Sequence, residues 1–113
     1  FLEALIEATK PGGFACISLW RFLTDDGLAA KAKASTTSGI AELGYPKEQF
    51  DEGDCLLGWR NEAGAYRYCH SFSDAEIEDL IETVSGSAQL LARFQADGRT
   101  GNLNEYLVFQ RNW

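Results

Sequence analysis

The chain has 113 residues, of which 45% are hydrophobic, 12% aromatic and 24% charged. This composition excludes a disordered chain, and a globule of this size buries roughly 65% of its unfolded surface, so it can hold a core. Acidic residues outnumber basic ones by 17 to 10, for a net charge of −7. Because nucleic-acid phosphates must be neutralised by lysine and arginine, we expect no DNA partner and no strong binding of RNA by this chain alone.

The first ten residues have the pattern of a helix with one apolar face, formed by Phe1, Leu2, Leu5, Ile6 and Thr9. A natural N-terminus rarely begins in mid-helix without a cap, and the chain has no methionine, so we interpret it as part of a longer protein. The sequence Lys10-Pro11-Gly12-Gly13 ends the helix. Residues 14–20 then form a near-continuous apolar run, typical of a central strand buried on both faces. This succession favours an α/β fold.

Residues 21–72 are interpreted as an excursion that carries the substrate side of the molecule. Residues 28–34 predict a short helix, residues 35–39 have the composition of a loop, and Pro46 begins another turn. Residues 54–59 and 66–72 are strand-like, and the segment 60–65 between them has a length that suits a hairpin.

The next helix is the best marked of the chain. Ser73 as N-cap with Glu76 three residues later forms a capping box, and the apolar stripe that follows leads to a stop at Gly86. Residues 88–96 and 103–111 predict two strands. The short connection between them contains two glycines, so they form an antiparallel pair and one strand runs against the others in a mixed sheet.

Three widely spaced cysteines, Cys16, Cys55 and Cys69, and a single histidine indicate neither a disulfide framework nor a zinc site. We therefore expect a reduced, cytoplasmic protein without a metal. No stretch approaches the roughly 18 consecutive apolar residues of a membrane span, so we expect no membrane partner.

This order of elements resembles the second half of class I S-adenosylmethionine-dependent methyltransferases, over essentially the whole chain. In that family the fifth strand follows a proline-glycine-glycine turn, and the sixth and seventh strands form an antiparallel edge. The resemblance implies that residues 1–113 are the C-terminal portion of a single Rossmann-like methyltransferase domain. It also implies that S-adenosylmethionine is bound mainly by a missing upstream half, that no residue of this segment binds the cofactor, and that the fragment alone is inactive.

Three short strings carry a narrower resemblance to the tRNA wobble-uridine carboxymethyl methyltransferases. They are Ser18-Leu19-Trp20-Arg21-Phe22, Gly53-Asp54-Cys55-Leu56-Leu57-Gly58-Trp59 and Arg67-Tyr68-Cys69-His70-Ser71-Phe72. The resemblance implies a tRNA-modifying activity on a uridine carboxylate and a small protein partner. The chain departs from that family in its acidity and in its connection at residues 97–102.

Ligands of open α/β sheets lie beyond the carboxyl ends of the strands, which selects residues after the first strand and in the last connection. His70 is a candidate base for a nitrogen or hydroxyl acceptor, and no other residue is assigned to catalysis. The candidates for substrate binding are Trp20, Arg21, Trp59, Arg67, His70, Arg99 and Asn102.

Each candidate also has a plainer explanation. Aromatic side chains commonly pack in hairpins, His70 could be a packed or surface residue, and Arg99 could be an ordinary surface arginine. Asp54 after Gly53 is typical of a turn. Two alternatives to the tRNA enzyme therefore stay open: a small-molecule methyltransferase of the same fold, and a non-catalytic α+β binding or interaction module with exposed aromatic side chains as its partner surface.

Overall fold

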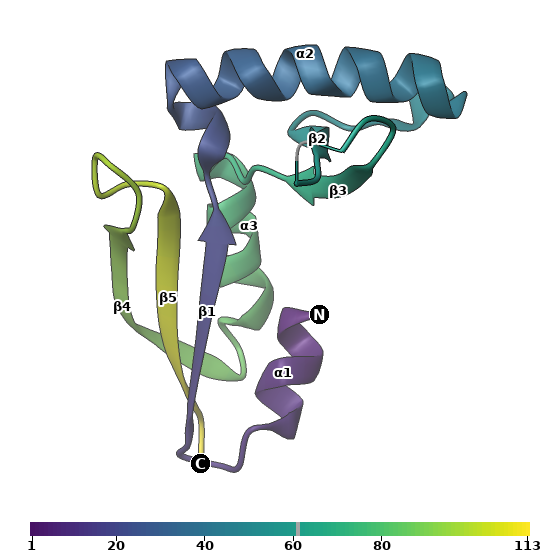
Figure 1. Ribbon diagram of the computed structural model, residues 1–113. Coiled ribbons are helices and arrows are strands. Elements are labelled where there is room, and N and C mark those ends of the chain that lie inside the picture. The colour runs from purple at the N-terminus through teal and green to yellow at the C-terminus, as the bar shows by residue number, and fades with distance from the viewer. Residues whose placement is uncertain (61) are drawn as a thin grey trace. The chain divides into compact units, whose positions relative to one another are not determined.

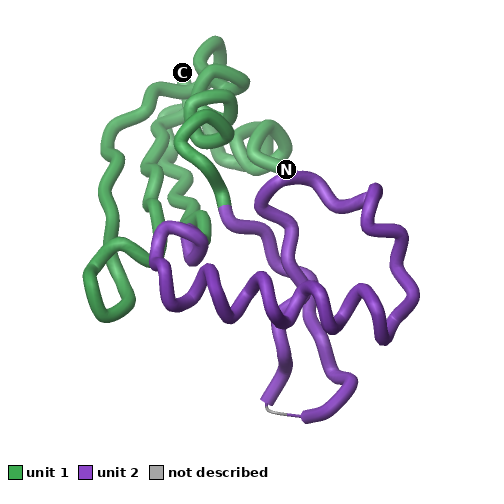
Figure 2. The backbone as a smooth tube through the Cα atoms, turned by 90° about the horizontal axis from the view of Figure 1, so that it is seen from above, with its two compact units in different colours: residues 1–20, 72–113 green, residues 21–71 purple. Residues whose placement is uncertain are grey.

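The structure is a computed structural model that describes residues 1–60 and 62–113. These residues form two compact units, shown in Figure 2: a first unit of residues 1–20 and 72–113 and a second unit of residues 21–71. The first unit contains α1 (Leu2–Ala8), β1 (Phe14–Trp20), α3 (Asp74–Val84), β4 (Ala88–Ala96) and β5 (Asn104–Arg111). The second contains the 3-10 helices η1 (Phe22–Thr24) and η2 (Lys47–Gln49), with α2 (Asp26–Leu43), β2 (Asp54–Gly58) and β3 (Tyr66–His70). Within the described ranges, no helix has the length and apolar character to cross a membrane.

The sheet of the first unit has the order β1-β5-β4, and β5 pairs antiparallel with both neighbours (Figure 1). β1 and β4 therefore run in the same direction, with β5 reversed between them. Leu107 on β5 lies opposite Ile17 on one side and Arg93 on the other. The predicted antiparallel pair is thus confirmed, and one strand runs against the other two, although both neighbouring pairs of this sheet are antiparallel.

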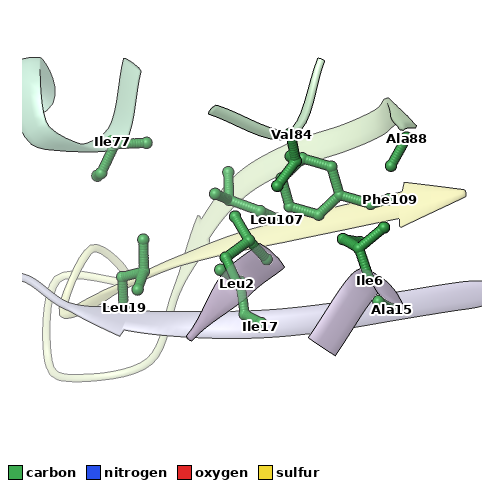
Figure 3. Close-up of a cluster of buried hydrophobic side chains, with 10 residues drawn as sticks. All are labelled: Leu2, Ile6, Ala15, Ile17, Leu19, Ile77, Val84, Ala88, Leu107 and Phe109. Atoms are coloured by element: carbon green, nitrogen blue, oxygen red, sulfur yellow. The ribbon is translucent and has the colours of Figure 1, made fainter. Parts of the chain in front are cut away.

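The core of the first unit lies on one face of this sheet (Figure 3). Ala15, Ile17 and Leu19 of β1 are buried, whereas Phe14, the first residue of the strand, is 67% exposed. The prediction that this strand is buried on both faces was wrong. The physical reason is that α1 and α3 both contribute to the same core, which takes the odd-numbered side chains and leaves the even-numbered ones outside it.

The first helix confirms most of its predicted face, because Leu2 and Ile6 are buried in the core. Phe1 is 76% exposed and does not belong to that face, contrary to the sequence pattern. The carboxyl end of α1 receives two hydrogen bonds from Arg111 Nη1, which donates to the carbonyls of Glu7 and Thr9. An arginine from β5 therefore satisfies carbonyls that a helix end leaves without intrahelical partners.

The capping box of α3 forms as predicted. The Ser73 hydroxyl accepts from the Glu76 amide, and the Glu76 carboxylate accepts from the Ser73 amide. Ile77 and Val84 are fully buried on the apolar stripe of the helix. The last helical residue is Val84, two residues before the predicted stop.

The long helix α2 overturns the predicted loop at residues 35–39, which lie inside it. The hydroxyls of Thr36 and Thr37 donate to carbonyls four residues earlier, so these polar side chains are satisfied within the helix. Gly39 is buried, and a Cβ there would come within 3.0 Å of both Leu56 and Tyr66. The small and polar residues are present because the β2–β3 hairpin packs closely on the helix, not because the helix ends.

The predicted hairpin of the second unit is present as β2 and β3, which pair antiparallel. The Trp59 amide donates to the Ala65 carbonyl, which extends the pairing beyond Gly58. Asn61, within the expected connection of residues 60–65, lies outside the described residues. Cys55 and Cys69 lie opposite each other and are free thiols.

Substitution of Leu107 by alanine should lower the free energy of unfolding by about 2–5 kcal/mol, because it leaves a cavity among fully buried side chains. Leu91→Ala is the matched control, since Leu91 is 46% exposed and its loss should change stability by about 0.5 kcal/mol or less. Urea unfolding followed by circular dichroism measures both. Equal losses in the two variants would contradict the assigned core.

Removal of the capping hydroxyl in Ser73→Ala should cost about 1 kcal/mol of stability, because the amide of Glu76 loses its acceptor. Ser38→Ala replaces an exposed serine inside α2 and should be neutral or slightly stabilising, since alanine has the higher helix propensity. Thermal unfolding of the two variants side by side tests the difference. A destabilised Ser38→Ala with an unchanged Ser73→Ala would reverse the expectation.

Candidate functional site

The most concentrated polar chemistry of the second unit surrounds the carboxylate of Asp54, the first residue of β2. The Tyr68 hydroxyl donates to Oδ1 of Asp54 at 2.5 Å, and Nδ1 of His70 lies 2.7 Å from the same oxygen. The backbone amide of Asp51 donates to Oδ2 at 2.9 Å. Three groups from β3 and from the turn before β2 therefore meet at one carboxylate.

The local sequence explains why these side chains meet. His70 lies opposite Asp54 in the hairpin register, and Tyr68 shares its strand face because side chains two residues apart point the same way. Gly53 has a φ of 93°, and a Cβ there would lie 2.5 Å from the Ser71 carbonyl oxygen and 2.9 Å from the His70 ring. Only glycine allows the backbone to approach this closely before Asp54.

The hydrogen bonds shift the titration of the group. Burial by itself raises the pKa of the Asp54 carboxyl, but the hydrogen bonds from Tyr68, His70 and the Asp51 amide, with the charge of His70, together lower that pKa below its usual value. The same hydrogen bond from the tyrosine to the carboxylate, with some burial, raises the pKa of Tyr68 to about 12. The stable state at neutral pH is an ionised Asp54 beside a neutral phenol.

A pocket of about 250 Å³ opens beside the carboxylate. Its lining combines aromatic rings, one amide, one aliphatic side chain and the carboxylate: Tyr45, Gln49, Phe50, Asp54, Leu56 and Tyr68. The rings of Tyr45 and Phe50 meet edge to face, with centroids 6.3 Å apart and planes at 70°. The pocket is thus an aromatic recess with a negative charge in its wall.

This arrangement can hold a histidine in one tautomer. Of the two neutral tautomers of the imidazole, a carboxylate at Nδ1 favours the one with its proton on Nδ1, in which Nε2 is the basic nitrogen. Orientation of a base by a carboxylate is a recurrent arrangement in acid–base catalysis. The side chains of His70 and Asp54 are 18% and 11% exposed, so the pair is shielded from most solvent.

Two other sequence candidates come together at the far end of the hairpin. The guanidinium of Arg67 lies 5.1 Å from the centre of the Trp59 ring, and that of Arg60 lies 5.2 Å from it. Trp59 is 41% exposed. Arg67 contacts Trp59, whereas His70, three residues later on the strand, contacts Asp54, so these two candidates lie in different parts of the hairpin.

The remaining candidates are dispersed along the chain. Trp20 is the last residue of β1 and is half-buried, and Arg21 follows it with 6% of its surface exposed. Arg99 is exposed in the connection between β4 and β5. In the same connection, the amide oxygen of Asn102 accepts from the Thr100 hydroxyl.

Sequence reasoning did not select Asp54 or Tyr68 as site residues. Asp54 was interpreted as a turn former, which is half of its role, because its Oδ2 does accept the Asp51 amide across the turn. A usable signal was the tyrosine two residues before the only histidine, on a strand opposite an aspartate. The partners are 14 and 16 residues apart, so only the hairpin register connects them.

The described residues do not fit a complete site for a methyl donor such as S-adenosylmethionine. Cofactor sites of Rossmann-like folds place a glycine-rich turn between a strand and the helix after it. Here β1 is followed by η1 and the N-cap Asp25, and residues 21–38 contain a single glycine, Gly27 in the first turn of α2, which does not make a glycine-rich turn. Nor do the described residues contain a group of three or more metal-ligating side chains.

Comparison with known proteins gives one informative result. No protein-family model matches the chain, and no curated protein matches its sequence. A solved structure of a SAM-dependent methyltransferase from Methanosarcina mazei is similar, with a TM-score of 0.60 and 14% sequence identity over 98% of this chain. The chain spans 49% of that methyltransferase, about half its length. The chain therefore has the α/β fold of part of that methyltransferase.

The tyrosine of the Asp54 group should titrate near pH 12, above its usual value of 10.0. Because the folded state favours the neutral phenol, this contribution to stability is complete below pH 10 and is lost as the pH rises from about 10 towards 12. Asp54→Asn should move the midpoint of Tyr68 back towards 10, since a neutral amide holds the phenol less strongly. NMR titration of the tyrosine ring carbons measures the midpoint.

Asp97→Asn supplies the control for this titration. Asp97 accepts from the Tyr106 hydroxyl in the first unit, and that hydrogen bond raises the pKa of Tyr106. The control variant should lower the midpoint of Tyr106 and leave that of Tyr68 unchanged. An ordinary Tyr68 midpoint in the unsubstituted protein would show that the phenol does not donate to Asp54.

Proposed function

We propose that this chain is the C-terminal, acceptor-side portion of a cytoplasmic S-adenosylmethionine-dependent methyltransferase whose cofactor-binding half precedes Phe1. The observation that carries the proposal is the structural similarity to a SAM-dependent methyltransferase over 98% of this chain and 49% of the other. The cofactor would supply an electrophilic methyl group. In this proposal residues 1–113 are part of one methyltransferase domain, and residues 21–72 are its substrate-side insertion.

Within this proposal the second unit binds the methyl acceptor. The Asp54–His70 pair supports an acceptor whose nucleophile is a nitrogen or a hydroxyl, because such groups give up a proton and Nε2 of an oriented histidine can take it. The small pocket beside Asp54 supports a small-molecule acceptor. Its lining includes no lysine or arginine, so a carboxylate acceptor would meet a like charge without compensation.

A second candidate acceptor is the carboxymethyl group of a tRNA wobble uridine, with a small protein partner. The observation that favours it is the exposed Trp59 between Arg60 and Arg67, which offers an aromatic surface for a base and two guanidinium groups for phosphate or carboxylate. The net charge of −7 and the negative pocket argue for the small molecule. A non-catalytic interaction module is the alternative from another class, and it would bind no methyl donor.

Binding of S-adenosylmethionine to the full-length protein tests the proposal. We expect calorimetry to detect binding by the full-length protein and none by residues 1–113 alone. With a competent acceptor, His70→Gln should lower the rate of methyl transfer by about 10²–10⁴-fold and leave donor binding unchanged. Thr37→Ala, an exposed change on α2, is the control and should keep the rate. A full-length protein that binds no donor would contradict the proposal.

Salt separates the two acceptor classes. If tRNA is the acceptor, its affinity for the full-length protein should fall steeply between 50 and 200 mM salt, by roughly tenfold or more even for a few phosphate contacts. A small-molecule acceptor should bind with nearly constant affinity over this range. Steep salt dependence of acceptor binding would favour the tRNA candidate over the small molecule.

A further inference from the structure

The pocket beside Asp54 has walls that suit a positively charged alkyl group. Tyr45 follows the end of α2, Phe50 follows η2 and Tyr68 lies on β3, so three aromatic side chains from separate segments border one recess. The ring centroids of Tyr45 and Phe50 are 6.3 Å apart and the ring planes meet at 70°, so the two rings contact each other edge to face. A volume of about 250 Å³ lies just below the usual range of ligand pockets, roughly 300–1,000 Å³, and suits a small ligand.

The carboxylate in the wall is fixed in place and retains acceptor capacity. Oδ1 of Asp54 accepts from Tyr68 and faces His70, and Oδ2 accepts from the Asp51 amide. A carboxylate has about four lone-pair positions, so these three contacts hold its orientation without exhausting it. A charge that is only 11% exposed and already oriented attracts a cation more strongly than a mobile surface carboxylate does.

The surrounding charge has the same sign. Between residues 45 and 54 the only cation is Lys47, against the carboxylates of Glu48, Asp51, Glu52 and Asp54. An anionic ligand would therefore be repelled. A neutral apolar ligand would displace water from the Asp54 carboxylate and offer no polar contact in return, which is unfavourable.

We propose that this pocket binds a small alkylammonium group, with the cation against the Asp54 carboxylate and its alkyl substituents against the rings of Tyr45, Phe50 and Tyr68. Aromatic faces attract ammonium groups through their quadrupole, and methylated ammonium ions also lose little hydration when they enter an aromatic recess. The proposal concerns binding alone. It names a ligand class for the pocket that is proposed above as the acceptor site, and it is measured without methyl transfer.

The test compares choline with 3,3-dimethylbutan-1-ol, a neutral molecule of nearly the same shape. Titration of the ¹⁵N-labelled protein with each compound, followed by NMR, gives both affinities and the residues that respond. Choline should bind at least about tenfold more tightly than the alcohol, with shifts confined to residues 45–70. Equal affinities, shifts centred in the first unit, or no binding of choline at several tens of millimolar would each overturn the proposal.

Variants assign the binding to the pocket wall. Phe50→Leu removes a ring but keeps an apolar side chain, and Asp54→Asn removes the charge; each should weaken choline at least about fivefold. Phe94→Leu is the matched control, because Phe94 belongs to the first unit and the pocket residues belong to the second. The Phe94 ring stacks on Tyr106, with ring centroids 5.1 Å apart and planes at 5°. The affinity of this variant for choline should be unchanged. Unaltered binding in Phe50→Leu would overturn the proposal even if Asp54→Asn proved unstable.

The outcome is distinguishable from that of the proposed function. If the full-length protein binds S-adenosylmethionine but not choline, only the alkylammonium site is overturned. Choline binding by a protein that binds no methyl donor overturns only the methyltransferase assignment.

Discussion

The candidate site depends on one constraint, the register of the β2–β3 hairpin. Strand side chains alternate between faces, so a slip of one residue would carry Tyr68 and His70 to the side opposite Asp54. Two features outside the ladder hold this register. The Leu56 amide donates to the Thr36 hydroxyl at 3.0 Å, and Gly39 lets Leu56 and Tyr66 approach the helix axis closely. Thr36 and Gly39 of α2 therefore help to fix the register that brings the Asp54 group together on the hairpin.

The two units are held together in different ways. The first unit consists of a sheet with β5 reversed between β1 and β4 and of helices that share one core, which is the part of the chain where apolar burial is continuous. The second unit has a long helix with few buried side chains and concentrates its polar contacts at Asp54. Packing dominates the first unit, and hydrogen bonds and charge give the second its chemistry.

Sequence patterns predicted the elements whose causes are local. The capping box at Ser73, the glycine turn after Lys10 and the final strand pair each depend on residues within a few positions of one another, and all are present. The prediction of a loop at residues 35–39 was wrong because the threonine and glycine there contact the hairpin, about 20 residues away in sequence. Burial on both faces of β1 was wrongly inferred because an apolar run does not reveal which faces are covered. Asp54 was missed as a site residue for the same reason as the loop: its partners are distant in sequence.

The backbone hydrogen bond from the Phe72 amide to the Trp20 carbonyl, at 2.9 Å, joins the two residues of the first unit that flank the second in sequence. The first unit thus closes on itself at the point where the chain leaves and returns. The entropy of closing a loop grows only slowly with its length, so the first unit tolerates very different segments between these two residues. Exchange of that whole segment is therefore a route by which one scaffold could acquire a new ligand while its own core stays untouched.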